Sequence, residues 1–247
     1  MRLKEKVAIV TGGASGIGKA TVKNMIQEGA RVVIADIADD QGTQLAQKLN
    51  KKKKKAVYCP VDVTEEEDTL KMVKKAEEEF GKLDIIFCNA GIGDMAHTEQ
   101  LAEEKWQKII DVNLTGVFLS IKAAIPALKD NGGGSIINCA SILGHVGQAQ
   151  TASYSASKGG VVNMTRALAA EYATANIRIN AVCPGYIETP ILEDLDDEMR
   201  KKLVARHPIG RFGQPEEVAT ATTFLASEEA SFITGANLLI DGGYTAV

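Results

Sequence analysis

The sequence has few of the residues that hold small secreted or metal-stabilised domains together. Its 247 residues include only four cysteines, which lie far apart in or beside apolar runs: Cys59, Cys88, Cys139 and Cys183. This spacing fits neither a CxxC metal site nor a dense disulfide framework. We therefore expect four buried thiols in a reducing cytosol.

Long apolar runs and aromatic-containing basic clusters are also missing. No apolar run approaches the roughly 18 residues of a membrane span, and residues 1–6 lead into too short an apolar stretch for a signal peptide. Lys and Arg number 28 against 32 Asp and Glu, for a net charge of −4. The one low-complexity tract, lysines 51–55, is expected to be a solvated surface turn. We expect a cytoplasmic protein with a small-molecule substrate and neither a nucleic-acid nor a membrane partner.

Short β-branched runs alternate with longer segments of helical period. Expected strands cover residues 7–11, 31–36, 56–60, 83–88, 135–140, 177–183 and 237–240. Helices are expected to end near residues 28 and 49, and to cover 65–80 and roughly 117–128 and 152–173. This alternation predicts an α/β fold with a seven-stranded parallel sheet whose strands are buried on both faces. No repeat or linker divides the chain, so residues 1–247 are expected to form one domain.

A glycine-rich turn follows the first expected strand and precedes a helix expected from Lys19 onward. The turn reads Thr11-Gly12-x-x-x-Gly16-x-Gly18. Glycines allow a ligand close to the backbone, and a helix N-terminus offers free N–H groups and partial positive charge to a pyrophosphate. A plain βα turn is the alternative, but the order of strand, loop and helix favours a dinucleotide site.

An acidic residue closes the second expected strand. Asp36 lies about 20 residues past the glycines, where a carboxylate accepts hydrogen bonds from the adenosine ribose hydroxyls. The carboxylate would repel a 2′-phosphate, and residues 37–40 offer no Arg or Lys to hold one. We therefore expect NAD to be preferred over NADP. An N-cap role of Asp36 for the next helix stays open.

A tyrosine and a lysine are placed for acid–base chemistry. Tyr154 and Lys158 stand four residues apart, so on a helix they share one face. A cation within about 4–6 Å favours a phenolate, so we expect Lys158 to lower the pKa of Tyr154 from about 10 toward neutrality. A phenol tuned in this way could exchange protons with a substrate.

Together these motifs resemble the short-chain dehydrogenase/reductase family over nearly the whole chain. The resemblance rests on the glycine turn, Asn89-Ala90-Gly91, Ser141 and Tyr154-x-x-x-Lys158, and extends to Asn113, Asp62 and the run 184–189. It implies a Rossmann-type three-layer α/β/α sandwich with a doubly wound sheet. It also implies hydride transfer between a nicotinamide and a ketone or secondary alcohol.

The resemblance assigns roles to individual residues. Tyr154 would be the general acid or base, Ser141 would hold the substrate oxygen, and Lys158 would bind the nicotinamide ribose. Asn113 would help to keep a water relay to bulk solvent. The coenzyme would contact a larger set: Gly12, Ser15, Gly16, Ile17, Gly18, Asp36, Ile37, Asp62, Val63, Asn89, Ala90, Gly91, Tyr154, Lys158, Pro184, Gly185, Ile187 and Thr189.

Two features depart from these motifs or stay outside them. Cys88 stands where the family usually has a second Asn before Asn89, so one supporting hydrogen bond could be missing. The histidines His97, His145 and His207 have no metal-like spacing, and we assign them no catalytic role. His145 either faces water or lines the substrate cleft. No metal is expected.

Residues 186–211 are expected to form a lid over the substrate, with an acidic run on its solvent-exposed face.

The excess of small and apolar residues on helices 117–128 and 152–173, together with the resemblance, predicts a homotetramer. The C-terminal motifs look like those of 3-oxoacyl-thioester reductases, acting on acyl carrier protein or coenzyme A, which is the first functional hypothesis. The alternatives are a sugar or small secondary-alcohol or diol dehydrogenase, similar to glucose 1-dehydrogenase, and, more remotely, a non-catalytic NAD-binding protein.

Overall fold

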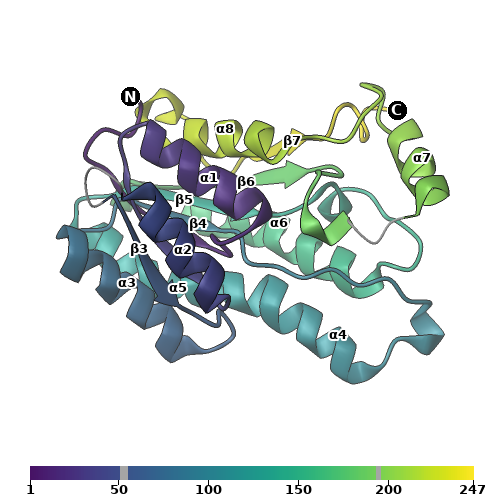
Figure 1. The fold of residues 1–247 in the computed structure, drawn as a ribbon, viewed down its shortest axis with the longest axis horizontal. Helices are drawn as coiled ribbons and strands as arrows, with labels where there is room; N and C mark the ends of the chain where they lie inside the picture. The colour runs from purple at the N-terminus through teal and green to yellow at the C-terminus, as the bar shows by residue number, and fades with distance from the viewer. Residues whose placement is uncertain (51–54, 193–195) are drawn as a thin grey trace.

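Seven parallel strands form one sheet in the computed structural model, which describes residues 1–50, 55–192 and 196–247 (Figure 1). The strands are β1 Val7–Thr11, β2 Arg31–Asp36, β3 Ala56–Pro60, β4 Ile85–Cys88, β5 Gly134–Cys139, β6 Ile177–Pro184 and β7 Asn237–Ile240. Their order is β3-β2-β1-β4-β5-β6-β7, and each neighbouring pair is parallel. The predicted doubly wound sheet is therefore confirmed. The expected turn at 51–55 lies, apart from Lys55, outside the described residues.

Alternate residues of the central strands enter two separate cores, because successive strand side chains point to opposite faces. Val7 and Ile9 pack with Val33 in one core, whereas Ala8 and Val10 belong to the other. All five residues of β1 are buried. The strands are apolar throughout because both faces of the sheet are covered by helices. The four cysteines are free and buried, as expected.

The helices lie in two layers, one on each face of the sheet (Figure 1). One layer contains α1 Gly16–Gln27, α2 Asp39–Leu49 and α8 Pro215–Ala226, and the other contains α3 Glu66–Phe80, α4 Glu103–Ile110, α5 Gly116–Asp130 and α6 Ala152–Tyr172. A short helix, α7 Asp197–Ala205, lies beyond the carboxyl ends of the strands. Five 3₁₀ turns also occur in the described chain, at Thr98–Gln100, Ile142–Gly144, Ala173–Ala175, Pro190–Leu192 and Glu228–Ala230.

A π-helical turn, Asp111–Thr115, joins α4 and α5 into one helical run, Glu103–Asp130. By length and composition this run could cross a membrane, although the sequence contains no uninterrupted apolar stretch of that size. Half of its apolar window is buried inside the protein, and α5 packs against α3 and β4. A buried core helix of a globular protein can have the same length and apolar composition.

Helix α1 begins three residues earlier than the sequence predicted. It starts at Gly16, directly after its N-cap Ser15, so Gly16 and Gly18 belong to the first helical turn and not to the preceding loop. The low helix propensity of glycine hid this boundary. Tertiary contacts decide it, because α1 packs closely against α8 and β2. The other predicted boundaries differ from the observed ones by one or two residues, as helix and strand ends commonly do.

The sheet reverses its winding between β1 and β4. The chain proceeds outward from β1 to β2 and β3, then returns through α3 to β4 on the other side of β1. At such a switch point the connections after the two strands diverge, which opens a crevice at their carboxyl ends. The glycine turn after β1 and the Asn89 loop after β4 therefore face each other.

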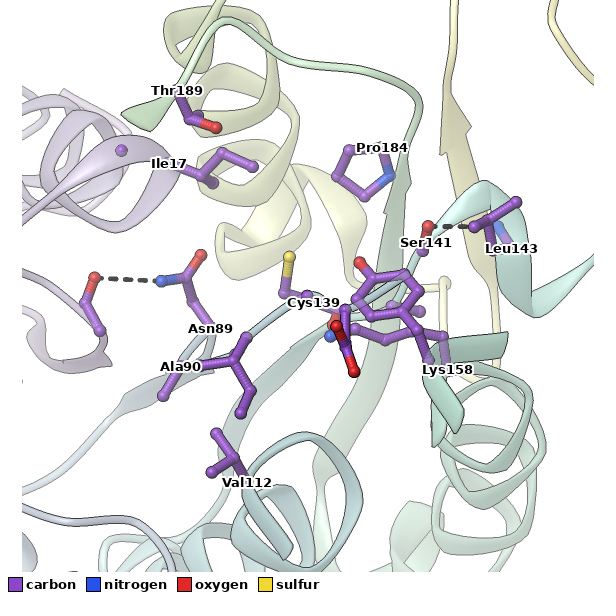
Figure 2. A pocket seen from close by; sticks show the side chains of 18 of the residues that line it. Ile17, Asn89, Ala90, Val112, Cys139, Ser141, Leu143, Lys158, Pro184 and Thr189 are labelled. Carbon is purple, nitrogen blue, oxygen red and sulfur yellow. Dashed lines mark hydrogen bonds between the residues drawn. The ribbon is translucent and has the colours of Figure 1, made fainter. Parts of the chain in front are cut away.

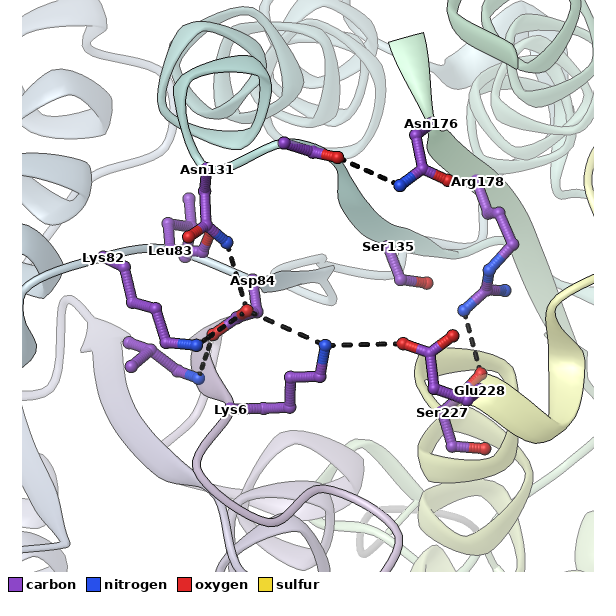
Figure 3. A network of polar contacts seen from close by, with 12 residues as sticks. Lys6, Lys82, Leu83, Asp84, Asn131, Ser135, Asn176, Arg178, Ser227 and Glu228 are labelled. Atoms are coloured by element: carbon purple, nitrogen blue, oxygen red, sulfur yellow. Dashed lines mark hydrogen bonds and ion pairs between the residues drawn. The ribbon is translucent and has the colours of Figure 1, made fainter. Parts of the chain in front are cut away.

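A polar network fixes the opposite, amino edge of the same strands (Figure 3). Asp84 is 5% exposed and accepts hydrogen bonds from the Val7 amide at 2.8 Å and from Lys82 and Asn131 at 3.1 Å. Lys6 adds an ion pair at 3.9 Å. A buried carboxylate is stable only when it is paired in this way. The network anchors β1 to β4 and leaves their other ends free to form the cleft.

Candidate active site

A single cleft of about 1340 Å³ runs across the carboxyl ends of the strands. This volume exceeds the roughly 300–1,000 Å³ of a typical small-molecule pocket, so it has room for a dinucleotide and a substrate together. All but two of the residues predicted for catalysis or coenzyme binding line it. Figure 2 shows Ile17, Asn89, Ser141 and Lys158 reaching it from four separate elements.

The two exceptions are Gly18 and Asn113, which support the cleft from behind. A Cβ on Gly18 would lie 2.0 Å from the carbonyl oxygen of Gly12. Gly12 itself has φ +61°, in the left-handed region that favours glycine. The turn is therefore compressed against the start of α1, whose N-terminus carries no side-chain cap. Such a terminus is suited to an anionic ligand.

We predict that Gly18→Ala abolishes coenzyme binding or prevents folding, because the added methyl group overlaps a backbone carbonyl that cannot move aside. Circular dichroism and NADH fluorescence titration measure the two outcomes. The matched control is Gly147→Ala, since nothing lies within 4 Å of a Cβ built there and its φ is ordinary. A Gly18→Ala protein that binds NADH like the parent would contradict this reading of the turn.

The turn is held on its other side by the loop after β4. The Asn89 side-chain amide donates to the carbonyl oxygens of Thr11 at 2.9 Å and Gly12 at 3.1 Å. The Thr11 hydroxyl accepts from the backbone amides of Asn89 at 2.9 Å and Ala90 at 3.1 Å. The sequence motif contained Thr11, but its role as a clamp was not predicted. Cys88 is buried behind these bonds and takes no part in them.

Asp36 joins the glycine turn to the end of β2. One carboxylate oxygen accepts from the Ala14 amide at 2.9 Å and the other from the Ala38 amide at 3.0 Å. Helix α2 begins at Asp39 with Ala38 as its N-cap, so the alternative N-cap role of Asp36 is excluded. Each oxygen keeps a lone pair for a ligand. The next residue, Ile37, is 74% exposed at the cleft edge.

Tyr154 and Lys158 lie one turn apart on α6, as predicted, and both line the cleft. Lys158 is only 3% exposed. Its ammonium donates to the Cys139 carbonyl at 2.8 Å and lies 5.6 Å from the centre of the Tyr154 ring. Ser141, two residues after β5, accepts a hydrogen bond from the Leu143 amide at 3.1 Å, and its hydroxyl is also hydrogen-bonded to Tyr154.

The prediction that Lys158 lowers the pKa of Tyr154 is wrong for the protein without coenzyme. Burial raises the pKa of Tyr154 to about 12, and the hydrogen bond to Ser141 lowers it only in part. Burial also lowers the pKa of Lys158. Moving either group out of water penalises its charged form, and this is the largest effect on each pKa. The helical spacing revealed the pair but not the depth at which it lies.

Asn113 is fully buried, so it does not face solvent. Its side chain binds the Ile92 backbone twice, accepting from the amide and donating to the carbonyl, both at 2.8 Å. It stands in the π-helical turn, where the Gly116 amide bonds to the Asp111 carbonyl five residues earlier. Such turns are frequent at functional sites. Asn113 therefore positions the loop after β4 at the cleft.

The sequence analysis did not predict two contacts at and beside the cleft. The Tyr186 hydroxyl donates to the Gln148 side chain at 2.8 Å, so the loop after Ser141 is joined to the segment after β6. His207 is buried and accepts from the Tyr186 amide at 3.3 Å. His145 is exposed, bonds to the Cys183 sulfur at 3.4 Å and is not among the cleft residues.

No group of three or more His, Cys, Asp or Glu side chains in the described parts of the chain could hold a metal ion. The cleft contains the Asp36 carboxylate, and its other polar groups include the phenol of Tyr154, the hydroxyl of Ser141 and the ammonium of Lys158. This set suits a dinucleotide coenzyme and a substrate whose oxygen gains or loses a proton.

The fold and this cleft define a short-chain dehydrogenase/reductase, and the chain belongs to that family. A family model described as "Enoyl-(Acyl carrier protein) reductase" matches residues 12–245. The predicted resemblance is therefore confirmed, and the protein is an oxidoreductase that acts on alcohol and carbonyl groups.

Several relatives match almost the full length of the chain. Cis-4-hydroxycyclohexanecarboxylate dehydrogenase from Sinomonas cyclohexanicum is 47% identical over 98% of both chains. Cyclohexanol dehydrogenase from an Acinetobacter strain is 43% identical over 99% of this chain and 96% of its own. The 3-oxoacyl-[acyl-carrier-protein] reductase FabG of Thermotoga maritima is 42% identical over 98% and 99%. A solved short-chain dehydrogenase/reductase from Mycobacterium marinum has a TM-score of 0.95 at 38% identity and covers 99% of this chain and 97% of its own.

Proposed function

We propose that this protein is an NAD(H)-dependent dehydrogenase that interconverts a small cyclic secondary alcohol and its ketone. The observation that carries the proposal is that one cleft contains both Asp36 and the group of Ser141, Tyr154 and Lys158. The names of two relatives, cyclohexanol dehydrogenase and the hydroxycyclohexanecarboxylate enzyme, support a cyclic alcohol.

The residues present fit a nicotinamide dinucleotide. The glycine turn leaves no room for a side chain between Gly12 and Gly18, and the uncapped N-terminus of α1 suits a pyrophosphate. Asp36 suits the two ribose hydroxyls of NAD and opposes the additional phosphate of NADP. Bound here, the coenzyme would accept the hydride in oxidation or supply it in reduction.

The residues of the chain handle the proton and the substrate oxygen. Tyr154 takes the hydroxyl proton during oxidation and returns it during reduction. Ser141 donates its hydroxyl proton to the same oxygen, where negative charge develops. The Lys158 ammonium has three N–H donors. One donates to the Cys139 carbonyl, so two remain for the nicotinamide ribose. Asn113 holds the Ile92 backbone beside the cleft and helps to keep a water relay to bulk solvent.

A 3-oxoacyl thioester is the second candidate substrate, supported by the FabG relative. The charges at the cleft disfavour it. Asp94, Glu103, Glu104 and Asp111 line the cleft, and Lys108 is the only cation among its described residues besides Lys158. A coenzyme A or carrier-protein thioester brings phosphate groups with it, and these carboxylates would repel them.

A steady-state screen tests both the substrate and the coenzyme. Cyclohexanol with NAD⁺ or NADP⁺ is compared with acetoacetyl-CoA with NADH or NADPH, using the purified full chain. We expect cyclohexanol oxidation with NAD⁺ to have the highest kcat/KM. Efficient reduction of acetoacetyl-CoA without alcohol oxidation would establish the second candidate instead, and NADH binding without any turnover would indicate the non-catalytic alternative.

The raised pKa of Tyr154 predicts how the rate depends on pH. Oxidation needs the phenolate, and a pKa of about 12 keeps Tyr154 protonated at neutral pH. The reactive fraction therefore grows as pH rises, and we expect kcat/KM for alcohol oxidation to increase from pH 6 to pH 9, by at most about tenfold per unit. Ketone reduction uses the protonated form and should not rise over this range. An oxidation rate that falls with pH would contradict the role of Tyr154.

We also propose that residues 186–211 act as a lid and that the protein is a homotetramer. Leu192, Met199 and Leu203 of this segment line the cleft, while residues 193–195 lie outside the described chain. The exposed side chains of Phe118 and Phe232, 46% and 103% exposed, support assembly. Protection of the segment from trypsin by NADH tests the lid, and sedimentation equilibrium tests the tetramer.

A further inference from the structure

The loop after β4 contains a carboxylate whose hydrogen bonding is incomplete. Asp94 lines the cleft. Its Oδ1 accepts a hydrogen bond from the adjacent Met95 amide at 2.9 Å. Its Oδ2 is buried from solvent and has no hydrogen-bond partner. An unsatisfied buried acceptor is destabilising, more so when it is charged, and it is rarely retained without a function.

The loop that carries Asp94 is held in place on both sides. On one side the Asn113 side chain binds both backbone groups of Ile92. On the other side the Ala96 amide donates to the Gln150 carbonyl at 2.9 Å. Gln150 adopts φ +66°, which is unusual for a residue other than glycine. Asp94 is thus two residues from each anchor, in a position fixed before any ligand binds.

The same loop begins beside the catalytic group. A Cβ on Gly91 would lie 3.6 Å from the ammonium of Lys158. Asp94 is three residues farther along this loop and lines the same cleft as Tyr154 and Lys158.

We propose that Asp94 is a specificity-determining residue that accepts a hydrogen bond from a second hydroxyl group, placed across the substrate ring from the carbon that is oxidised. The terminal torsion of an aspartate is broad, so the carboxylate can turn its unpaired oxygen into the cleft. The preferred substrate is then a neutral cyclic diol, and a ring with a carboxylate at the same position is repelled. This inference rests on the proposed alcohol dehydrogenase function.

The test compares trans-1,4-cyclohexanediol, cyclohexanol and 4-hydroxycyclohexanecarboxylate as substrates with NAD⁺. The parent is expected to favour the diol over cyclohexanol by roughly tenfold to a hundredfold in kcat/KM, the effect of one hydrogen bond to a charged group. Asp94→Ala should remove this preference, mainly through KM, and leave cyclohexanol oxidation unchanged. Asp94→Asn should raise the relative activity on the carboxylate.

A matched control separates this hydrogen bond from the general charge of the cleft. Asp111→Asn removes a carboxylate that also lines the cleft but already accepts from Gln107 at 2.8 Å. It should leave the diol preference intact. Thermal unfolding supplies a further readout, since removal of a carboxylate with one buried, unpaired oxygen at Asp94 should not lower the melting temperature. A parent without diol preference, or a preference that survives in Asp94→Ala, overturns the proposal.

Equilibrium binding distinguishes failure of this inference from failure of the proposed function. Calorimetry with the protein–NADH complex should show tighter binding of the diol than of cyclohexanol, and Asp94→Ala should lose the difference. If no alcohol is turned over but this difference is present, the dehydrogenase function fails and the role of Asp94 stands. Equal binding of the two compounds overturns the role of Asp94 even if both are oxidised.

Discussion

Tyr154→Phe is expected to reduce kcat for alcohol oxidation by about 10²–10⁴-fold, the usual contribution of a positioned proton-transfer group. The substitution removes only the hydroxyl oxygen, which burial holds in its protonated form. The ring keeps its place on α6, and Lys158 keeps its bond to the Cys139 carbonyl. NADH affinity and the melting temperature should therefore change little, because only one hydroxyl of a half-buried side chain is lost.

Steady-state kinetics with cyclohexanol and NADH fluorescence titration measure the two effects. Tyr172→Phe is the matched control, since it removes a hydroxyl from the last residue of the same helix, outside the cleft. It should behave like the parent. A Tyr154→Phe protein that keeps more than a tenth of the parent kcat would show that another group transfers the proton, and Ser141 would then be the first candidate.

The double change Asp36→Ala with Ile37→Arg is expected to shift the ratio of kcat/KM for NAD⁺ over NADP⁺ by about a hundredfold or more toward NADP⁺. Loss of the carboxylate removes charge-assisted hydrogen bonds to the ribose, each worth roughly 1.5–3 kcal/mol. A guanidinium at the exposed position 37 can bind a 2′-phosphate bidentately. The two effects act on different coenzymes, so they multiply in the ratio.

Asp36 also holds the Ala14 and Ala38 amides, so its loss is expected to weaken binding of both coenzymes to some degree. The ratio, measured with one alcohol at fixed pH and ionic strength, cancels that common loss. Asp40→Ala removes one negative charge from exposed α2 nearby and serves as the control for net charge. An unchanged ratio in the double variant would refute the assignment of Asp36 to the ribose.

Local patterns were sufficient for the fold and for placing Tyr154 and Lys158 together at the cleft. The alternation of β-branched runs and helical segments predicted the seven parallel strands because strands buried on both faces must be apolar throughout. The spacing of Tyr154 and Lys158 predicted a shared helix face because the helical period is fixed. The glycine turn was also found from a local pattern, the spacing of its glycines. The low helix propensity of glycine nevertheless led us to place the start of α1 at Lys19 instead of Gly16.

Other properties of the site depend on contacts between segments far apart in the chain. Asn113 and Ile92 are 21 residues apart, and Asn89 and Thr11 are 78 apart. No short pattern shows that these pairs meet, nor that the helix around Asn113 takes a π turn. The loop that presents Asp94 is likewise fixed by Asn113 and Gln150, which come from different elements.

The sequence by itself therefore determined the sheet and the family, and it identified the candidate side chains at the cleft, because periodicity and short motifs are local. Only the tertiary structure decided how deeply those groups are buried and which polar atoms have no hydrogen-bond partner. Burial reverses the expected shift in the pKa of Tyr154, and it leaves one oxygen of Asp94 without a partner. Solvation is a property of the packed molecule, since every element that surrounds a group contributes to removing it from water.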